Sequence, residues 1–132
     1  MSYALTELQV SILKVLWARG ECTVVDVHDA LRAERRIAQS TVATLLSRLE
    51  KKGLVSHRAE GRQYVYRALV DEGQVRSSVV AEFTELAGRL FEGDVATMVS
   101  HLLTAQEVEG GDLARIREMV ERREADLKGG DR

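Results

Sequence analysis

The spacing of apolar residues near the N-terminus predicts two amphipathic helices. Thr6 and Gln9 are separated as in a capping box, and the helix that they open is expected to end at Gly20. Thr23 and Asp26 repeat this spacing before a shorter helix. Apolar positions recur at helical spacing in both segments, at Leu8, Ile12, Leu13 and Leu16 in the first and at Val27, Ala30 and Leu31 in the second.

A third helix is expected over residues 39–52, with Gly53 as its stop. One face carries an apolar stripe formed by Val42, Leu45, Leu46 and Leu49. The opposite face carries hydroxyl and basic side chains and no acidic one, namely Ser40, Thr41, Thr44, Ser47, Arg48 and Lys51. An ordinary solvated helix face usually includes glutamate, so this composition sets the third helix apart.

Two runs of β-forming residues follow the third helix. Residues 54–59 and 63–69 are joined by Glu60-Gly61-Arg62, a short glycine-containing connection that is typical of a β-hairpin. Tyr64 and Tyr66 share one face of the second run. Exposed aromatic side chains can stack on the bases of a nucleic acid, but we expect these two to pack against the third helix instead. Three helices followed by a basic hairpin predict a winged helix-turn-helix.

The remainder of the chain shows only helical periodicity. It predicts a helix with an apolar stripe from Val75 to Leu90, a short helix capped by Asp94, and a last helix that Asp112 caps after Gly110-Gly111. Three narrow stripes over about 60 residues can hardly bury a private core, so a second copy of the chain is expected to cover them. We assign the dimer contacts to Val79, Phe83, Leu86, Leu90, Leu102, Ile116 and Val120.

Charge divides the chain at the same point as the elements. The predicted fold class is mainly α with a small β-hairpin, in which residues 1–70 form a winged helix-turn-helix DNA-binding domain and residues 71–132 a helical dimerisation domain. The first part holds 11 Lys and Arg against 7 Asp and Glu, a net charge of +4, and the second holds 8 against 14, a net charge of −6. Residues 35–67 alone carry a net charge of +6, which indicates a polyanionic partner.

The sequence favours a binding protein over an enzyme. Its histidines are spread over separate elements, Cys22 is its single cysteine, and it contains no phosphate-binding glycine loop. We therefore expect no catalytic residue, no metal site and no cofactor. No apolar run reaches the ~18–20 residues of a membrane span, and the N-terminus lacks the pattern of a secretory signal. A cytoplasmic location without membrane contact is expected.

The third helix and the hairpin carry the candidate DNA contacts. In a helix-turn-helix the second helix of the motif enters the major groove, where hydroxyl and guanidinium groups read base edges. Thr41, Thr44 and Arg48 have this chemistry and this facing, while Gln39 and Ser40 are expected to contact bases or phosphates. Phosphate neutralisation is expected of Lys51, Lys52, Arg58 and Arg62. The alternative is a winged-helix module that docks proteins without specific DNA recognition, and the acid-free helix face argues against it.

Three stretches of the chain resemble one family of regulators. STVATLLSRLEKKGLV and EGRQYVY, together with LTELQVSILKVLW near the N-terminus, resemble the penicillinase-repressor (BlaI/MecI type) family of bacterial transcriptional repressors. The resemblance is close over residues 5–70 and looser over residues 71–127. It implies a homodimer whose winged helices each bind one half-site of an inverted-repeat operator in double-stranded DNA, while the C-terminal helices interlock.

The resemblance also implies how the repressor is controlled. Members regulate β-lactam resistance or copper-export genes, so control of antibiotic-resistance or stress genes is expected. The copper-sensing branch has a C-terminal cysteine cluster, which this chain lacks. In the β-lactam branch a sensor-activated protease cleaves the dimerisation region, usually at an Asn–Phe bond, and the matching position here is His101-Leu102.

The third helix departs from the family pattern. Where several members carry lysines this chain has Ser40 and Ala43, and Gln39 stands in place of a proline that often opens the helix. Since these positions belong to the helix that reads DNA, the operator is expected to differ from the TACA/TGTA half-sites common in the family.

Overall fold

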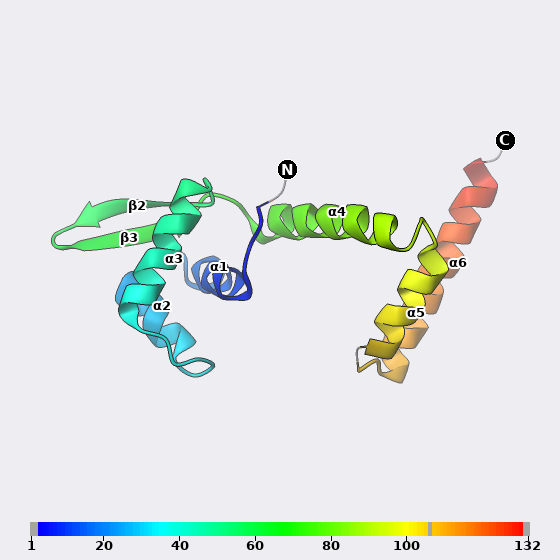
Figure 1. The fold of residues 1–132 in the computed structure, drawn as a ribbon, viewed down its shortest axis with the longest axis horizontal. Helices are drawn as coiled ribbons and strands as arrows, with labels where there is room; N and C mark the ends of the chain where they lie inside the picture. The colour runs from blue at the N-terminus through cyan, green and yellow to red at the C-terminus, as the bar shows by residue number, and fades with distance from the viewer. Residues whose placement is uncertain (1–2, 106, 131–132) are drawn as a thin grey trace. The chain divides into compact units, whose positions relative to one another are not determined.

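The structure is a computed structural model, and it describes residues 3–105 and 107–130. The outer ends of both predicted domains, residues 1–2 and 131–132, therefore lie outside the described residues. Within the described ranges the chain forms six α-helices and three β-strands (Figure 1). The chain divides between Glu85 and Leu86 into two compact units.

The N-terminal unit begins with three helices, α1 (Glu7–Arg19), α2 (Val24–Leu31) and α3 (Gln39–Lys51). Both predicted capping boxes are confirmed. The Thr6 hydroxyl accepts from the Gln9 backbone N–H at 3.3 Å, and the Gln9 side chain accepts from the Thr6 N–H at 3.0 Å. Thr23 and Asp26 make the same reciprocal bonds at 3.1 and 2.9 Å. Each box supplies partners to backbone N–H groups that a helix start leaves unpaired.

A three-stranded antiparallel sheet in the order β1-β3-β2 completes this unit. The predicted hairpin is confirmed as β2 (Val55–Glu60) and β3 (Gln63–Ala68), joined by a turn in which Gly61 has a φ of 62°. The sequence pattern does not predict β1 (Cys22–Thr23), which pairs with the other side of β3. Two residues are too few to show the alternation by which a strand is recognised.

The core of the N-terminal unit lies between the three helices and the sheet. The whole predicted stripe of α3 is buried in it, and Cys22 belongs to it as well. Burial raises the pKa of the Cys22 thiol. Tyr66 of β3 is buried in this core. Tyr64 stays 53% exposed and stacks on His57, so the prediction that both tyrosines pack against α3 is wrong for Tyr64.

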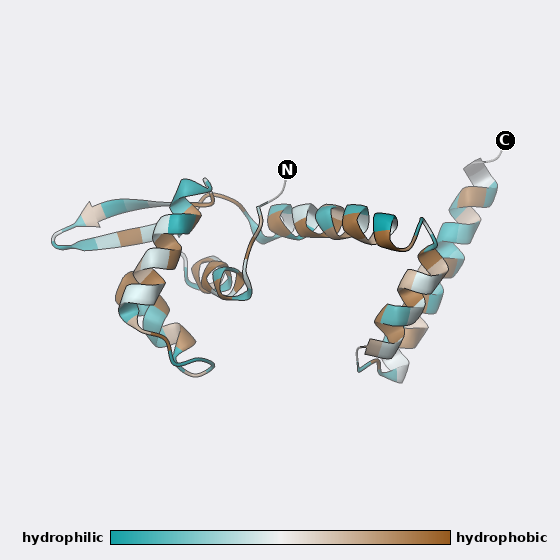
Figure 2. Ribbon diagram, viewed as in Figure 1, coloured by the Kyte–Doolittle hydropathy of each residue, from teal (hydrophilic) through white to brown (hydrophobic). Residues whose placement is uncertain are grey.

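The helix α4 (Glu72–Leu90) starts at a further reciprocal cap. The Asp71 carboxylate accepts from the Gln74 N–H at 2.7 Å, and the Gln74 side chain accepts from the Asp71 N–H at 2.9 Å. Val75 is buried, whereas the larger apolar side chains farther along the helix are exposed. Figure 2 shows that apolar positions recur along α4 and again along α5 (Val95–Ala105).

The C-terminal unit contains the end of α4, then α5 and α6 (Gly110–Gly130). The predicted cap at Asp94 is confirmed, because its carboxylate accepts from the Thr97 N–H at 3.0 Å and from the Thr97 hydroxyl at 2.6 Å. The predicted cap at Asp112 is wrong, since α6 already begins at Gly110 and Asp112 lies in its first turn. A helical glycine costs only about 1 kcal/mol relative to alanine, so the glycine pair does not prevent this earlier start.

Candidate nucleic-acid interface

The buried stripe fixes the rotation of α3 about its axis. Val42, Leu46 and Leu49 are fully buried, which turns the opposite face outward. Every predicted contact residue of this helix is exposed: Gln39, Ser40, Thr41, Thr44, Arg48 and Lys51. Because side chains three and four positions apart lie on one face, the sequence pattern was sufficient to predict this surface.

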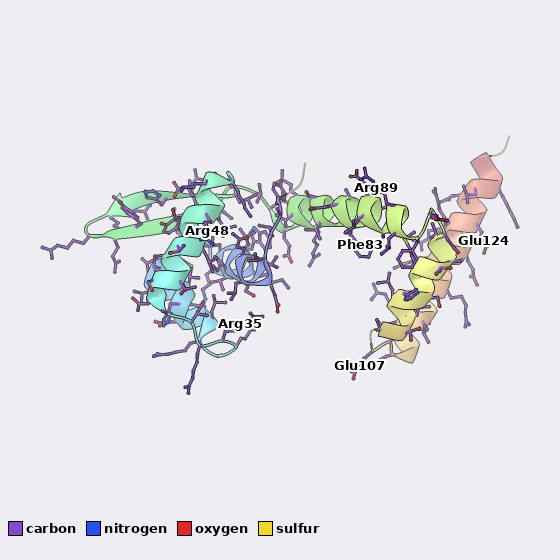
Figure 3. The ribbon with its side chains drawn as sticks, viewed as in Figure 1. Arg35, Arg48, Phe83, Arg89, Glu107 and Glu124 are labelled. Carbon is purple, nitrogen blue, oxygen red and sulfur yellow. The ribbon has the colours of Figure 1, made fainter. Side chains whose placement is uncertain are left out.

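Two side chains of this surface differ in the hydrogen bonds that they already make. The Thr44 hydroxyl donates to the Ser40 carbonyl oxygen at 3.0 Å, so its oxygen can still accept but its hydrogen is used within the helix. The Arg48 guanidinium has no hydrogen bond or ion pair to any residue in the described ranges. Arg48, labelled in Figure 3, is therefore an unpaired multiple donor on α3.

Lys52 has partners within the chain. Its ammonium donates to the backbone oxygen of Ala4 at 2.8 Å and to the side-chain oxygen of Gln9 at 3.3 Å. These bonds join the residue after α3 to Ala4, which precedes α1, and to Gln9 in the first turn of α1. Because its ammonium already makes two hydrogen bonds within the chain, Lys52 is less available to a phosphate than an unbonded lysine.

The two hairpin arginines lie in different surroundings. Arg58 in β2 donates to Glu21 at 2.7 Å and to Glu60 at 2.6 Å. Hydrogen bonding to Glu21, and then to Glu60, raises the pKa of the Arg58 guanidinium. Arg62 is exposed in the turn beside Gly61, and it has no such carboxylate partner among the described residues. Of the two cations, Arg62 is the more available to a phosphate.

The structure adds basic residues that the sequence analysis did not assign. Arg32, Arg35 and Arg36 occupy the turn between α2 and α3, and with His28 they line a depression of about 620 Å³. Arg35 forms an ion pair with Glu7 of α1, and His28 hydrogen-bonds the Ile37 carbonyl oxygen at 2.8 Å. The sequence signal for them is three arginines within the five residues 32–36, which also contribute to the positive charge of residues 1–70.

The predicted dimer residues lie on α4, α5 and α6. Phe83, labelled in Figure 3, is 52% exposed in the single chain, and Leu90 is 77% exposed. Val79, Leu86, Leu102 and Val120 are also exposed, and Ile116 is partly buried. No residue of α5 is buried within the described part of the chain. These helices therefore present apolar side chains that the single chain does not cover.

Residues 3–105 and 107–130 contain no group of three or more His, Cys, Asp or Glu side chains that could hold a metal ion. No helix in them has the length and apolar character needed to cross a membrane.

Known proteins similar to this chain include a penicillinase repressor and a transcriptional regulator. The family profile described as penicillinase repressor matches residues 5–122. The penicillinase repressor of Bacillus licheniformis is 24% identical over 117 residues, which is 89% of this chain and 89% of that protein. The transcriptional regulator BlaI of Mycobacterium tuberculosis is 43% identical over 63 residues, covering 47% of this chain and 46% of that protein.

A solved structure is similar as well. The solution structure of the monomeric form of Bacillus licheniformis BlaI, in complex with the blaP half-operator, is 31% identical with a TM-score of 0.45 and covers 52% of this chain and 83% of that chain. The family match extends over most of the present chain, far beyond the winged helix. The protein therefore belongs to the penicillinase repressor family and is a winged-helix, DNA-binding transcriptional repressor.

Proposed function

We propose that this repressor acts as a homodimer that occupies an inverted-repeat operator, with α3 of each subunit in the major groove and the β2–β3 hairpin as a wing beside it. The observation that carries this proposal is the exposed face of α3, which combines hydroxyl groups with the unpaired guanidinium of Arg48 and has no acidic side chain. A face of this kind matches the donors and acceptors of base edges in the major groove. A surface for docking proteins has no need of this composition.

The contact residues fall into two roles in this proposal. Thr41, Thr44 and Arg48 read base edges, and Gln39 and Ser40 contact the DNA at the N-terminal end of α3. Lys51 and Arg62 neutralise phosphates, joined by Arg32 and Arg36 from the turn before α3. Lys52 and Arg58 contribute less, because both are already bonded within the chain.

The proposed dimer uses residues 71–132, while residues 1–70 contact DNA. The exposed apolar side chains of α4, α5 and α6 support this division, because they lack cover in the single chain. Contiguous exposed apolar surface on a protein commonly marks an interface. The proposal includes a cytoplasmic location, where the operator DNA lies, and control of antibiotic-resistance or stress genes.

We further propose that release from the operator follows cleavage of α5 near His101-Leu102 by a sensor-activated protease. Two half-sites bound by a linked dimer gain affinity through effective concentration, so separating the two halves is expected to weaken binding by ~10²–10⁴-fold. Leu102 is 48% exposed in the single chain, and it becomes covered if α5 joins the dimer. Limited proteolysis of free and DNA-bound protein, analysed by mass spectrometry, tests this step, and nicks confined to the termini in both states contradict it.

The DNA-reading role is tested with Arg48→Ala. The operator is first selected from a randomised duplex pool by the wild-type protein, and affinities for it and for a random duplex are then measured by fluorescence anisotropy. We expect Arg48→Ala to lower operator affinity by ~1–3 kcal/mol more than random-DNA affinity, because a base contact is lost. The matched control, Lys51→Ala on the same helix, is expected to weaken both duplexes alike. An unchanged ratio for Arg48→Ala excludes the base contact.

A further inference from the structure

Two side-chain hydrogen bonds link the hairpin to the rest of the N-terminal unit, one on each face of β2. His57 Nδ1 lies 2.6 Å from Glu50 Oε1 of α3. The Arg58 guanidinium lies 2.7 Å from Oε2 of Glu21, a residue in the turn between α1 and β1. His57 and Arg58 are neighbours in β2, and consecutive residues of a strand point to opposite sides of the sheet. The strand is thus bonded on one side to α3 and on the other to the α1–β1 turn.

The imidazole of His57 contacts groups from two elements, and its side chain stays 31% exposed. Besides Glu50 of α3, it contacts two tyrosines of β3, with ring-centroid distances of 4.2 Å to Tyr64 and 5.4 Å to Tyr66. Burial, followed by the charge of Glu50 and by Tyr64, raises the pKa of Tyr66. Glu50, Tyr64 and Tyr66 are therefore the titratable groups that face His57 from α3 and β3.

This cluster lies where the hairpin leaves the core. Val55 and Tyr66 are buried and hold the base of the hairpin, whereas residues 58–64 are exposed. In the described part of the chain, the bond between Glu50 and His57 is the only side-chain hydrogen bond that joins α3 to the hairpin. Backbone pairing of β3 with β1 also holds the inner part of the hairpin. Among the described residues, the Glu50–His57 bond and the Arg58–Glu21 pair are the side-chain hydrogen bonds that link the hairpin to other elements, so we expect them to influence the orientation of its outer part.

We propose that Glu50 and His57 are a positioning pair that sets the angle of the wing relative to α3 and so determines how strongly the operator is preferred over other DNA. The proposal rests on the DNA-binding mode described above. The hairpin and α3 must contact the DNA at the same time. If the orientation of the hairpin varies, its phosphate contacts and the base contacts of α3 cannot all form together. Neither side chain has to touch DNA.

The bond between the two side chains is short, at 2.6 Å from His57 Nδ1 to Glu50 Oε1. Hydrogen bonds to a carboxylate are about twice as strong as those between neutral groups. Loss of this bond is therefore expected to loosen the outer hairpin.

Substitution of Glu50 removes both a negative charge and the positioning pair, and these two losses are expected to change DNA affinity in opposite directions. Removal of a carboxylate close to DNA raises affinity for every sequence, because repulsion from the phosphates is lost. Loss of the positioning pair lowers the affinity for the selected operator relative to random DNA. The ratio of the two affinities therefore separates the two effects.

The first experiment measures this ratio for the full-length chain, with the wild-type-selected duplex and a random duplex as probes. Glu50→Ala is expected to reduce the ratio about three- to tenfold. Glu50→Gln keeps a hydrogen-bond acceptor for the His57 ring, so its ratio should lie closer to that of the wild type than the ratio of Glu50→Ala does. Glu34→Gln, which removes the same charge from the turn before α3, is the matched control and should leave the ratio unchanged. A wild-type ratio for Glu50→Ala overturns the proposal.

The second experiment needs no DNA, so it still tests the pair if the chain selects no operator and the proposed DNA-binding mode fails. Nitroxide labels are attached to Ser47→Cys and Arg62→Cys, the labelled chain is diluted with unlabelled chain, and the distance between the labels is measured by pulsed electron resonance. A narrow distribution is expected for wild type and Glu50→Gln, and a broad one for Glu50→Ala. His57→Phe, which keeps an aromatic ring against Tyr64 but no hydrogen bond, should also broaden it. Equal widths in all four proteins overturn the proposal.

Discussion

Trp17 donates its indole Nε1–H to the carbonyl oxygen of Val70 across 2.8 Å. The bond joins the C-terminal part of α1 to the segment that leads from β3 into α4. Trp17 also lines a depression of about 360 Å³ together with Val75 and Val79 of α4. One directional bond and an apolar contact therefore hold α1 against the segment where the chain leaves the winged helix and begins α4.

Replacement of this donor is expected to destabilise the N-terminal unit. Trp17→Phe retains an aromatic ring but leaves the partly buried Val70 carbonyl without its partner, which costs about 1–3 kcal/mol of unfolding free energy. Urea denaturation followed by circular dichroism measures the loss. Val80→Ala, an exposed position beside the same depression, serves as the control and should change stability by no more than about 0.5 kcal/mol. Equal stability of Trp17→Phe and wild type contradicts the role of the bond.

The wing is expected to contribute to the salt dependence of DNA binding. Arg62→Ala should reduce the slope of log affinity against log salt by about one, for all sequences alike, because one phosphate is no longer neutralised. Arg58→Ala should reduce it by less, since Arg58 is paired with Glu21 and Glu60. Anisotropy titrations at several salt concentrations measure both slopes. If Arg62→Ala leaves the slope unchanged, the hairpin turn is not a DNA contact.

The dimer is expected to depend on the apolar face of α4. Phe83→Asp places an unpaired charge in the proposed interface at a cost of several kcal/mol, so the chain should sediment as a monomer and lose operator affinity. The far-ultraviolet signal of the winged helix should persist. Thr84→Asp adds the same charge at the neighbouring position, which points in another direction, and should remain dimeric. If Phe83→Asp dimerises with the same dissociation constant as the wild type, the interface lies on another surface.

The start of α5 is expected to respond to acid. Hydrogen bonds from the Thr97 hydroxyl and N–H lower the pKa of Asp94 below its ordinary value of 3.8. A carboxylate with a lowered folded-state pKa contributes stability above its ordinary pKa, and that contribution is lost as the pH falls through the lowered value. The Thr97 amide signal in nuclear magnetic resonance should therefore shift with a midpoint below 3.8. Asp94→Asn keeps the cap and should abolish that shift. A wild-type midpoint at or above the ordinary value contradicts the cap's effect.

Local features of this fold were predictable from the sequence because each depends on residues close together in the chain. The capping pairs Thr6–Gln9 and Thr23–Asp26 span three positions, and the outward face of α3 follows from the helical period. The hairpin follows from two β-forming runs around Gly61. The same local rule was wrong at Asp112, where it placed the cap two residues inside the helix.

The bonds that orient the site were decided only by the tertiary structure. Lys52 reaches Ala4 across 48 positions and Arg58 reaches Glu21 across 37. Strand β1 pairs with β3 although its two residues are too few to show a strand pattern. The link between Glu50 and His57 spans only seven positions, yet it forms because the chain reverses at Gly53 and brings β2 back beside α3. Periodicity states which face of an element is buried, but not which side chain of another element meets it. Specific partners arise only once packing of the core has fixed the distances between elements.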